Sequence, residues 1–251
     1  MHDLFSSPWS TLERAKHHIR DLERRLKPLM NDDGWSHVIE KDIDGITEIH
    51  KIRLVEPLAS DLPNILFDAA NNLRAALDQA GFAAALAAQK VDPKRAYFPF
   101  AESEAELSNV VARKCADLPP EILALFRSFQ PYKGGDPFLW ALNKLCNTKK
   151  HCTLVPINVG NFRLAYMVIH DGSRRLDPPP LAWERGKQEI EILRTKPGMK
   201  LEGKINFRFG VSIDDIDIIR GKPALGILDG TAAVVERVLM ATEAECRRIF
   251  G

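Results

Sequence analysis

Hydrophobic residues recur at helical spacing over three long stretches, residues 10–30, 60–89 and 228–250. In each, apolar side chains return every three or four positions, which predicts an amphipathic helix with one face in a core. Ser60 is the predicted N-cap of the second helix, and Pro63 fits its first turn. The predicted core stripes are Leu12, Ala15, Ile19, Leu22, Leu26 and Leu29; Leu62, Leu66, Ala70, Leu73, Leu77, Ala80 and Ala84; and Leu228, Ala232, Val235, Leu239, Cys246 and Ile249.

Shorter patterns lie between the second and third long helices. Two short helices are predicted near residues 102–113 and 120–129. A further helix begins after Asp136, because an Asp N-cap followed by Pro137 at the first helical position is a common helix start.

A β-hairpin is predicted around Asp44-Gly45. The dipeptide separates residues 38–43 from residues 46–54, and Asp-Gly is typical of a two-residue type I′ turn. This register places Lys41 opposite Glu48, so an opposite-charge pair crosses the two strands.

After Thr153 the pattern changes from helical to extended. Residues 154–157, 163–169 and 187–193 are predicted strands. Residues 205–213 alternate strictly between apolar and polar side chains, which predicts a strand with one buried face.

The order of these elements predicts an α+β fold in a single domain, residues 1–251. A helix-rich part, residues 1–152, would form a helical bundle and contain the hairpin. A strand-rich part, residues 153–227, would form a mainly antiparallel sheet, and a C-terminal helix, residues 228–250, would pack on the first helices.

Composition narrows the functional classes. Among 251 residues, 45% are hydrophobic and 27% charged, and 35 Lys and Arg nearly balance 34 Asp and Glu. This balance favours neither nucleic acid nor an anionic membrane as a partner of the whole surface. Four cysteines are too few for a disulfide scaffold. Neither a signal peptide nor a transmembrane segment is visible, so a cytoplasmic protein without a membrane partner is expected.

The second long helix carries a polar stripe of Asn71, Arg74 and Asp78, which fall within roughly 60° of one another on a helical wheel. Arg74 and Asp78 are four residues apart and can form an ion pair. Two interpretations follow. Either Asp78 and Asn71 hold the arginine for an anionic ligand, or the three form a salt-bridged surface stripe.

A second polar stripe follows Trp140. Asn143, Asn147 and Lys150 share its helical face, and His151 lies beside it. Lys150 and His151 could bind an anion, and His151 could act as an acid or base near neutral pH. Cations at a helix C-terminus also have a purely structural explanation, because they complement the helix dipole.

No metal or cofactor is predicted. Cys146, His151 and Cys152 include two zinc-ligand types, but the spacing lacks a second Cys or His pair of the usual kind. The sequence also contains no glycine-rich phosphate loop, no paired-histidine zinc helix and no nucleophilic serine flanked by glycines.

Four motifs in order resemble an uncharacterised family of bacterial proteins. They are Asn-Leu-Arg-Ala-Ala-Leu-Asp at 72–78, Phe-Pro-Phe at 98–100, Gln-Pro-Tyr at 130–132, and the run from Leu139 to His151. Members of that family tend to read NLRSALDH, FPI, QPY and L..L.N.DKHR. The resemblance covers roughly residues 50–170 and implies no particular activity.

The first motif also resembles, more remotely, the arginine–histidine motif of HEPN-type helical domains, many of which are ribonucleases linked to toxins and defence. In that motif Arg and His act together on the scissile phosphate and the ribose hydroxyl. Gln79 stands where the pattern has His, and Gln exchanges no proton near neutral pH. The resemblance makes Arg74 a candidate catalytic residue, and His151 is the second candidate, because it could substitute for the missing histidine if the fold brings it to Arg74.

Two functional hypotheses remain. The first is a bacterial cytoplasmic protein that binds a ligand or partner, or is structural, without catalysis. Its candidate binding residues are Asn71, Arg74, Asp78, Asn147, Lys150 and His151. The alternative is a HEPN-like metal-independent ribonuclease or a degenerate relative. RNA or another anionic ligand is the expected partner, and the apolar stripes of the terminal helices could support self-association.

Overall fold

The computed structural model describes residues 2–147, 154–158, 163–164, 183–184, 188–197, 205–206, 209–213, 217 and 219–251. Its architecture is α+β, as predicted. The helices are α1 (His2–Leu26), α2 (Leu62–Ala87), α3 (Glu104–Lys114), α4 (Pro120–Ser128), α5 (Pro137–Asn147) and α6 (Ala224–Phe250). The strands are β1 (Trp35–Lys41), β2 (Glu48–Leu54), β3 (Leu154–Asn158), β4 (Arg163–Leu164), β5 (Trp183–Glu184), β6 (Glu189–Thr195), β7 (Ile205–Asn206) and β8 (Phe209–Ile213).

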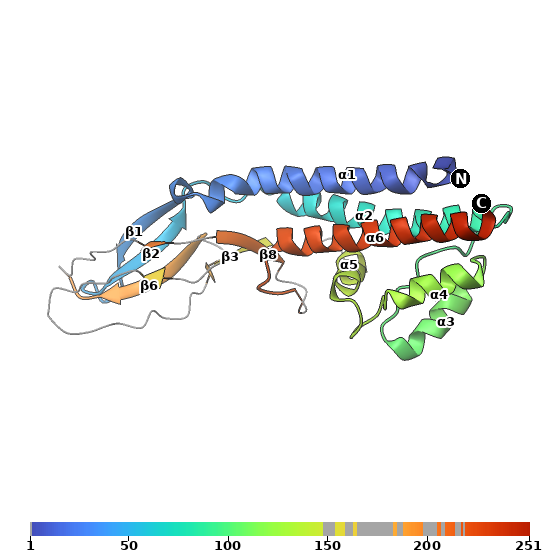
Figure 1. Cartoon of the computed structure of the whole chain (residues 1–251). Coiled ribbons are helices and arrows are strands. Elements are labelled where there is room, and N and C mark those ends of the chain that lie inside the picture. Colours follow the sequence, from blue (N-terminus) through green and yellow to red (C-terminus); the bar gives the residue numbers. More distant parts are fainter. Residues whose placement is uncertain are drawn as a thin grey trace.

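Three long helices, α1, α2 and α6, lie side by side and form the body of the molecule (Figure 1). Their predicted apolar stripes form its core. Every stripe residue is buried except Leu29 and Ile249, which are half-buried near the ends of their stripes. Because these stripes are covered within one chain, they do not supply the surface on which self-association was predicted.

Helix α1 begins at His2, eight residues before the predicted start at Ser10. Pro8 lies inside the helix and is buried. A proline there removes a single hydrogen bond near the N-terminus. Phe5 is fully buried one heptad before Leu12, so the core stripe continues across the proline and holds the first turns in place.

Helix α2 begins at Leu62 with Asp61 as its N-cap, so the prediction of Ser60 as N-cap is wrong, while Pro63 lies in the first turn as predicted. The Asp61 carboxylate makes no capping hydrogen bond and instead pairs with Arg25 of α1 at 2.6 Å. The Asp61 side chain thus links α1 to the start of α2 and does not cap the helix.

The segment after α2 packs closely against that helix. A Cβ on Gly81 would lie 2.2 Å from the Ala96 carbonyl oxygen, so glycine permits the close approach. The short helices α3, α4 and α5 follow, close to the predicted bounds. Asp136 caps α5 as predicted, because its Oδ1 accepts hydrogen bonds from the Phe138 and Leu139 amides at 2.9 Å each.

The hairpin belongs to the sheet rather than to the helical bundle. Strands β1 and β2 form antiparallel ladders in a four-stranded sheet of order β1-β2-β6-β5, which lies at the end of the molecule away from the chain termini (Figure 1). Lys41 lies opposite Glu48 in the ladder, so the predicted register is confirmed.

The predicted type I′ turn is wrong. That turn needs positive φ at both central residues, but only Gly45 has it, at 68°. The Asp44 carboxylate accepts hydrogen bonds from the Ile46 amide, the Thr47 amide and the Thr47 hydroxyl. These bonds hold Asp44 in an Asx-type turn without changing the strand register.

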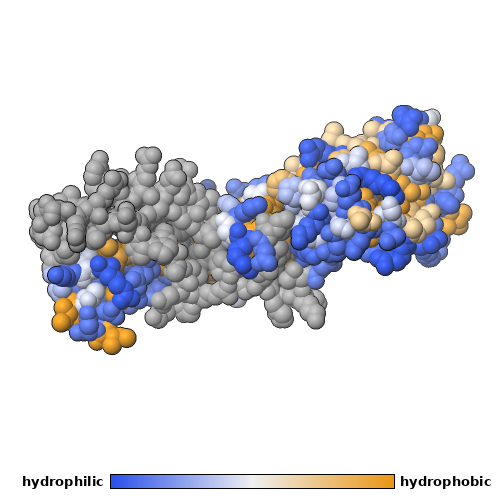
Figure 2. Space-filling view, turned by 90° about the horizontal axis from the view of Figure 1, so that it is seen from below, coloured by the Kyte–Doolittle hydropathy of each residue, from blue (hydrophilic) through white to orange (hydrophobic). Residues whose placement is uncertain are grey.

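The alternating run 205–213 contributes to two ladders. β7 pairs with β4, and β8 pairs with β3, both antiparallel. Residues 207–208, between them, lie outside the described residues, as do residues 165–169 of a predicted strand. At the tip of the hairpin, apolar side chains are exposed at the end of the molecule (Figure 2), namely Ile39, Ile43 and Ile46.

Candidate functional site

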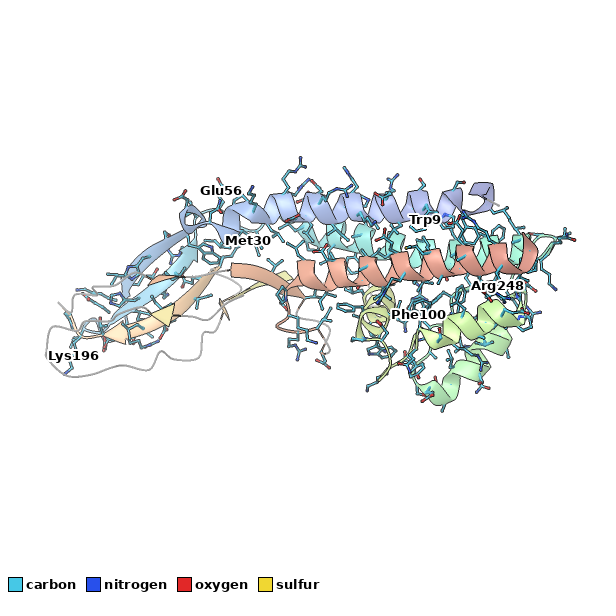
Figure 3. All side chains as sticks on the ribbon, in the orientation of Figure 1. Trp9, Met30, Glu56, Phe100, Lys196 and Arg248 are labelled. Carbon is cyan, nitrogen blue, oxygen red and sulfur yellow. The ribbon has the colours of Figure 1, made fainter. Side chains whose placement is uncertain are left out.

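Arg74 is the centre of the most distinctive polar cluster in the helical body. It lies half-buried on α2 and points towards α5 and the loop after α2. Its Nη1 donates a hydrogen bond of 2.9 Å to Asn143 Oδ1, and its Cζ lies 4.6 Å from the centre of the Phe100 ring. The ring supports the flat face of the guanidinium, below the long helices (Figure 3).

Asn143 and Asn147 extend the cluster along α5. They are four residues apart, and Asn147 Nδ2 donates to Asn143 Oδ1 at 2.9 Å, so the predicted shared face is confirmed for this pair. Asn143 is only 4% exposed, whereas Asn147 is exposed. The cluster therefore runs from the core to the surface.

Asp78 does not pair with Arg74, contrary to the predicted ion pair. Its Oδ1 accepts a hydrogen bond from the Phe98 amide at 3.0 Å. Burial raises the pKa of Asp78, while the Phe98 hydrogen bond and the charge of Arg74 oppose that rise. The Asp78 carboxylate thus anchors the loop that carries Phe100, and Arg74 forms its hydrogen bond with α5.

The charge of Arg74 has no carboxylate partner among the described residues, since no Asp or Glu oxygen lies within ion-pair distance of the guanidinium. The atom that accepts its hydrogen bond, Asn143 Oδ1, belongs to a neutral amide. The nearby Cys146 thiol is protonated near neutral pH, because burial raises its pKa to about 11 even though Arg74 opposes that rise. Buried or half-buried cations without a counter-ion are uncommon in proteins.

The remaining candidate residues do not join this cluster in the described structure. The Asn71 side chain is exposed on α2 and forms no hydrogen bond with a described residue, so the prediction that it helps hold Arg74 is wrong. Lys150 and His151 lie outside the described residues, as does Cys152.

Gln79 faces a different helix. Its Oε1 accepts hydrogen bonds from the Ser7 hydroxyl at 3.1 Å and the Thr11 hydroxyl at 2.9 Å, both on α1. Five residues along an α-helix correspond to a rotation of about 140°, so positions 74 and 79 point in different directions. Gln79 joins two long helices and does not face the Arg74 cluster.

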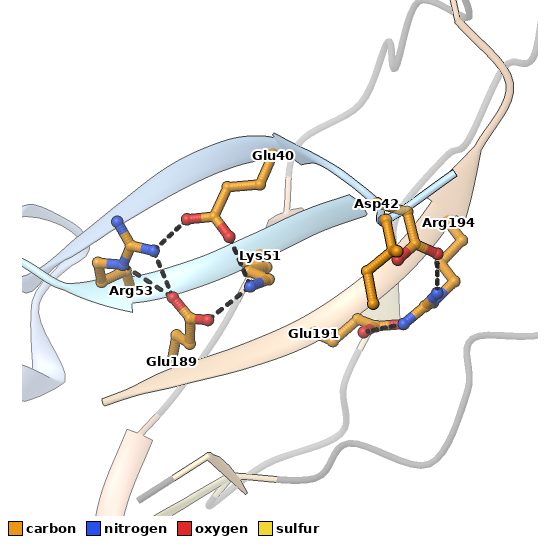
Figure 4. A network of polar contacts seen from close by, with 8 residues as sticks. Glu40, Asp42, Lys51, Arg53, Glu189, Glu191 and Arg194 are labelled. Atoms are coloured by element: carbon orange, nitrogen blue, oxygen red, sulfur yellow. Dashed lines mark hydrogen bonds and ion pairs between the residues drawn. The ribbon is translucent and has the colours of Figure 1, made fainter. Parts of the chain in front are cut away.

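Sequence reasoning missed a second polar cluster, in the sheet. Lys51 and Arg53 of β2 pair with Glu40 of β1 and Glu189 of β6 (Figure 4), at distances of 2.5–2.7 Å. Lys51 and Arg53 are two residues apart and so share one face of the strand. That spacing was the available signal, but a charged pair on a strand usually indicates an exposed face, whereas Lys51 is buried and Arg53 is half-buried.

Comparisons with protein-family models, curated proteins and solved structures find no match to this chain. No helix in the described part is long and apolar enough to cross a membrane. Among the described side chains, no group of three His, Cys, Asp or Glu is placed to hold a metal ion.

Proposed function

We propose that this protein is a binding protein that holds an anionic ligand, through a phosphate or carboxylate group, at Arg74. One observation carries the proposal. The guanidinium is half-buried, supported by an aromatic ring and an amide oxygen, and unpaired with any carboxylate of the described residues. An anion would supply the missing counter-charge, and guanidinium groups bind phosphate and carboxylate through paired hydrogen bonds.

The neighbouring amides suit the same ligand. Asn143 Oδ1 accepts hydrogen bonds from both Arg74 and Asn147, and the Asn143 Nδ2 group finds no acceptor among the described residues. An amide N–H donor beside a guanidinium adds a second contact for an oxyanion. Exposed Asn147 gives the ligand a route from solvent.

The described groups around Arg74 favour binding over catalysis. Cys146 stays protonated near neutral pH, Asp78 is occupied by the Phe98 amide, and Gln79 faces α1. A ribonuclease would need a proton acceptor within reach of the scissile group. The HEPN-like relation stays a prediction, and self-association stays one without the buried stripes that were named for it.

The three described cysteines, Cys115, Cys146 and Cys246, are free thiols. Unpaired cysteines are typical of a reducing compartment. These thiols support a cytoplasmic location as part of this proposal, while a bacterial source stays a prediction from the sequence resemblance.

The test is isothermal titration of the full chain with pyrophosphate and, separately, with succinate. Arg74→Gln should weaken binding about tenfold or more, because a hydrogen bond to a charged group contributes about 1.5–3 kcal/mol. Arg113→Gln, on the exposed surface of α3, is the matched control and should bind like the wild type. The proposal fails if wild type binds neither probe, or if both variants weaken binding equally.

A second arm separates binding from catalysis. Wild type, Arg74→Ala and His151→Ala are incubated with a mixed RNA pool in EDTA, and the products are resolved by size. We expect no cleavage by any of the three proteins. Cleavage by wild type that disappears in Arg74→Ala and in His151→Ala would replace the binding proposal with the ribonuclease alternative.

A further inference from the structure

A cleft of about 350 Å³ opens where the helical bundle meets the sheet. It lies between the end of α1, the segment leading into α2 and the neighbouring ends of β1 and β2, close to Glu56 (Figure 3). A volume of this size is typical of sites for small molecules. Its apolar lining residues are Pro28, Leu29, Val55, Pro57, Leu58, Ala59 and Leu62.

Hydrogen bonds to backbone carbonyl groups hold the wall of the cleft in place. The Val55 amide donates to the Gly34 carbonyl at 3.0 Å, and Trp35 Nε1 donates to the Leu29 carbonyl at 2.6 Å. A Cβ on Gly34 would lie 2.4 Å from the Pro28 carbonyl oxygen, so the chain approaches itself too closely there for a side chain. The cleft is therefore largely preformed, which lowers the cost of binding.

The charges of the cleft are not balanced. Arg25 is its cation, and it is already neutralised by Asp61 at 2.6 Å and Asp21 at 3.3 Å. Asp33 and Glu56 also line the cleft, and neither forms an ion pair with any described residue. The lining thus presents two unpaired carboxylates beside an apolar wall.

We propose that this cleft binds a small organic cation, namely an aliphatic chain that ends in a primary amine or guanidine. The chain would pack on the prolines and leucines, and its charged head would meet Asp33 and Glu56. This site is separate from Arg74 and opposite to it in charge. Leu62 and Arg74 are twelve residues apart on α2, which is about 18 Å along a helix.

Charge complementarity selects this ligand class over neutral or anionic molecules. A neutral molecule would leave both carboxylates without partners, and an anion would be repelled by them. Because the carboxylates are exposed, each is expected to contribute modestly, and binding should weaken as ionic strength rises.

The experiment is isothermal titration of the full chain with putrescine and agmatine, and with 1,4-butanediol as the neutral analogue of putrescine. Glu56→Gln and Asp33→Asn should each weaken putrescine binding roughly fivefold. Glu106→Gln, an exposed carboxylate on α3, is the control and should bind like the wild type. Thermal unfolding of each variant confirms that it is folded.

Three results would overturn the proposal. They are no heat of binding with either amine, butanediol binding as tightly as putrescine, and wild-type affinity in both cleft variants. Arg74→Gln should leave putrescine binding unchanged, so failure here is distinguishable from failure of the anion-binding proposal.

Discussion

Replacing Glu189 by Gln should destabilise the protein by about 3 kcal/mol. The Glu189 side chain is 1% exposed and accepts hydrogen bonds from Lys51 at 2.6 Å and Arg53 at 2.5 Å (Figure 4). Lys51 is itself only 6% exposed. Removing one partner of a buried ion pair costs about 3–5 kcal/mol, and the lower end applies because Glu40 still pairs with both cations.

Glu191→Gln is a matched control on the same strand. Glu191 pairs with Arg194 at 2.7 Å, but these side chains are 28% and 50% exposed. An exposed pair of this kind contributes about 0–1 kcal/mol. The two variants make the same chemical change two residues apart, so the difference between them measures the effect of burial.

Urea denaturation at pH 7 measures both free energies of unfolding, and hydrogen exchange of the β2 amides locates the loss in the sheet. The reasoning is refuted if Glu189→Gln costs no more than Glu191→Gln. Burial alone would raise the pKa of Glu189, but hydrogen bonds from Lys51 and Arg53 outweigh burial and lower it. Wild type should therefore lose this stabilisation as the pH falls below about 4.5, the unfolded pKa, and Glu189→Gln should lose less over the same range.

Two other perturbations test the core and the opposite face of the sheet. Leu73→Asp or Leu77→Asp should abolish soluble expression, because each places an unpaired charge at a fully buried position. If both variants are soluble and their melting temperatures are unchanged, the assignment of this side of α2 to the core is wrong. His37 Nε2 and His50 Nδ1 lie 3.0 Å apart, and burial lowers the pKa of both, so stability should fall as the pH drops below about 6.5. His37→Gln should reduce the change in melting temperature between pH 7 and pH 5. If the melting temperature of this variant depends on pH as strongly as that of the wild type, the histidine pair is not the cause of the loss of stability.

The long helices could be predicted because their faces depend on local periodicity. Leu66, Leu73 and Leu77 share one side of α2 whatever the rest of the chain does, and that side is buried. The start of α1 could not be predicted equally well. Pro8 is a local signal against a helix, but the buried side chain of Phe5 outweighs it through tertiary packing.

Helical spacing placed Arg74 and Asp78 on one side of α2 but did not identify the groups that they contact. Arg74 and Asp78 are placed for an ion pair by spacing alone, yet each finds a competing partner on another segment. The Phe98 amide and the Asn143 side chain come from elements 20 and 69 residues away along the chain. Helical spacing shows which residues share a face but contains no information on which distant groups arrive there.

The geometry of α2 also changes the significance of position 79. The absence of His there was the strongest sequence argument against catalysis. Because positions 74 and 79 differ by about 140° around the helix, a histidine at 79 on this α2 would face the α1 hydroxyls now bonded to Gln79. Position 79 of α2 is therefore not placed to supply a proton acceptor beside Arg74. Gln79→His should therefore create no ribonuclease activity.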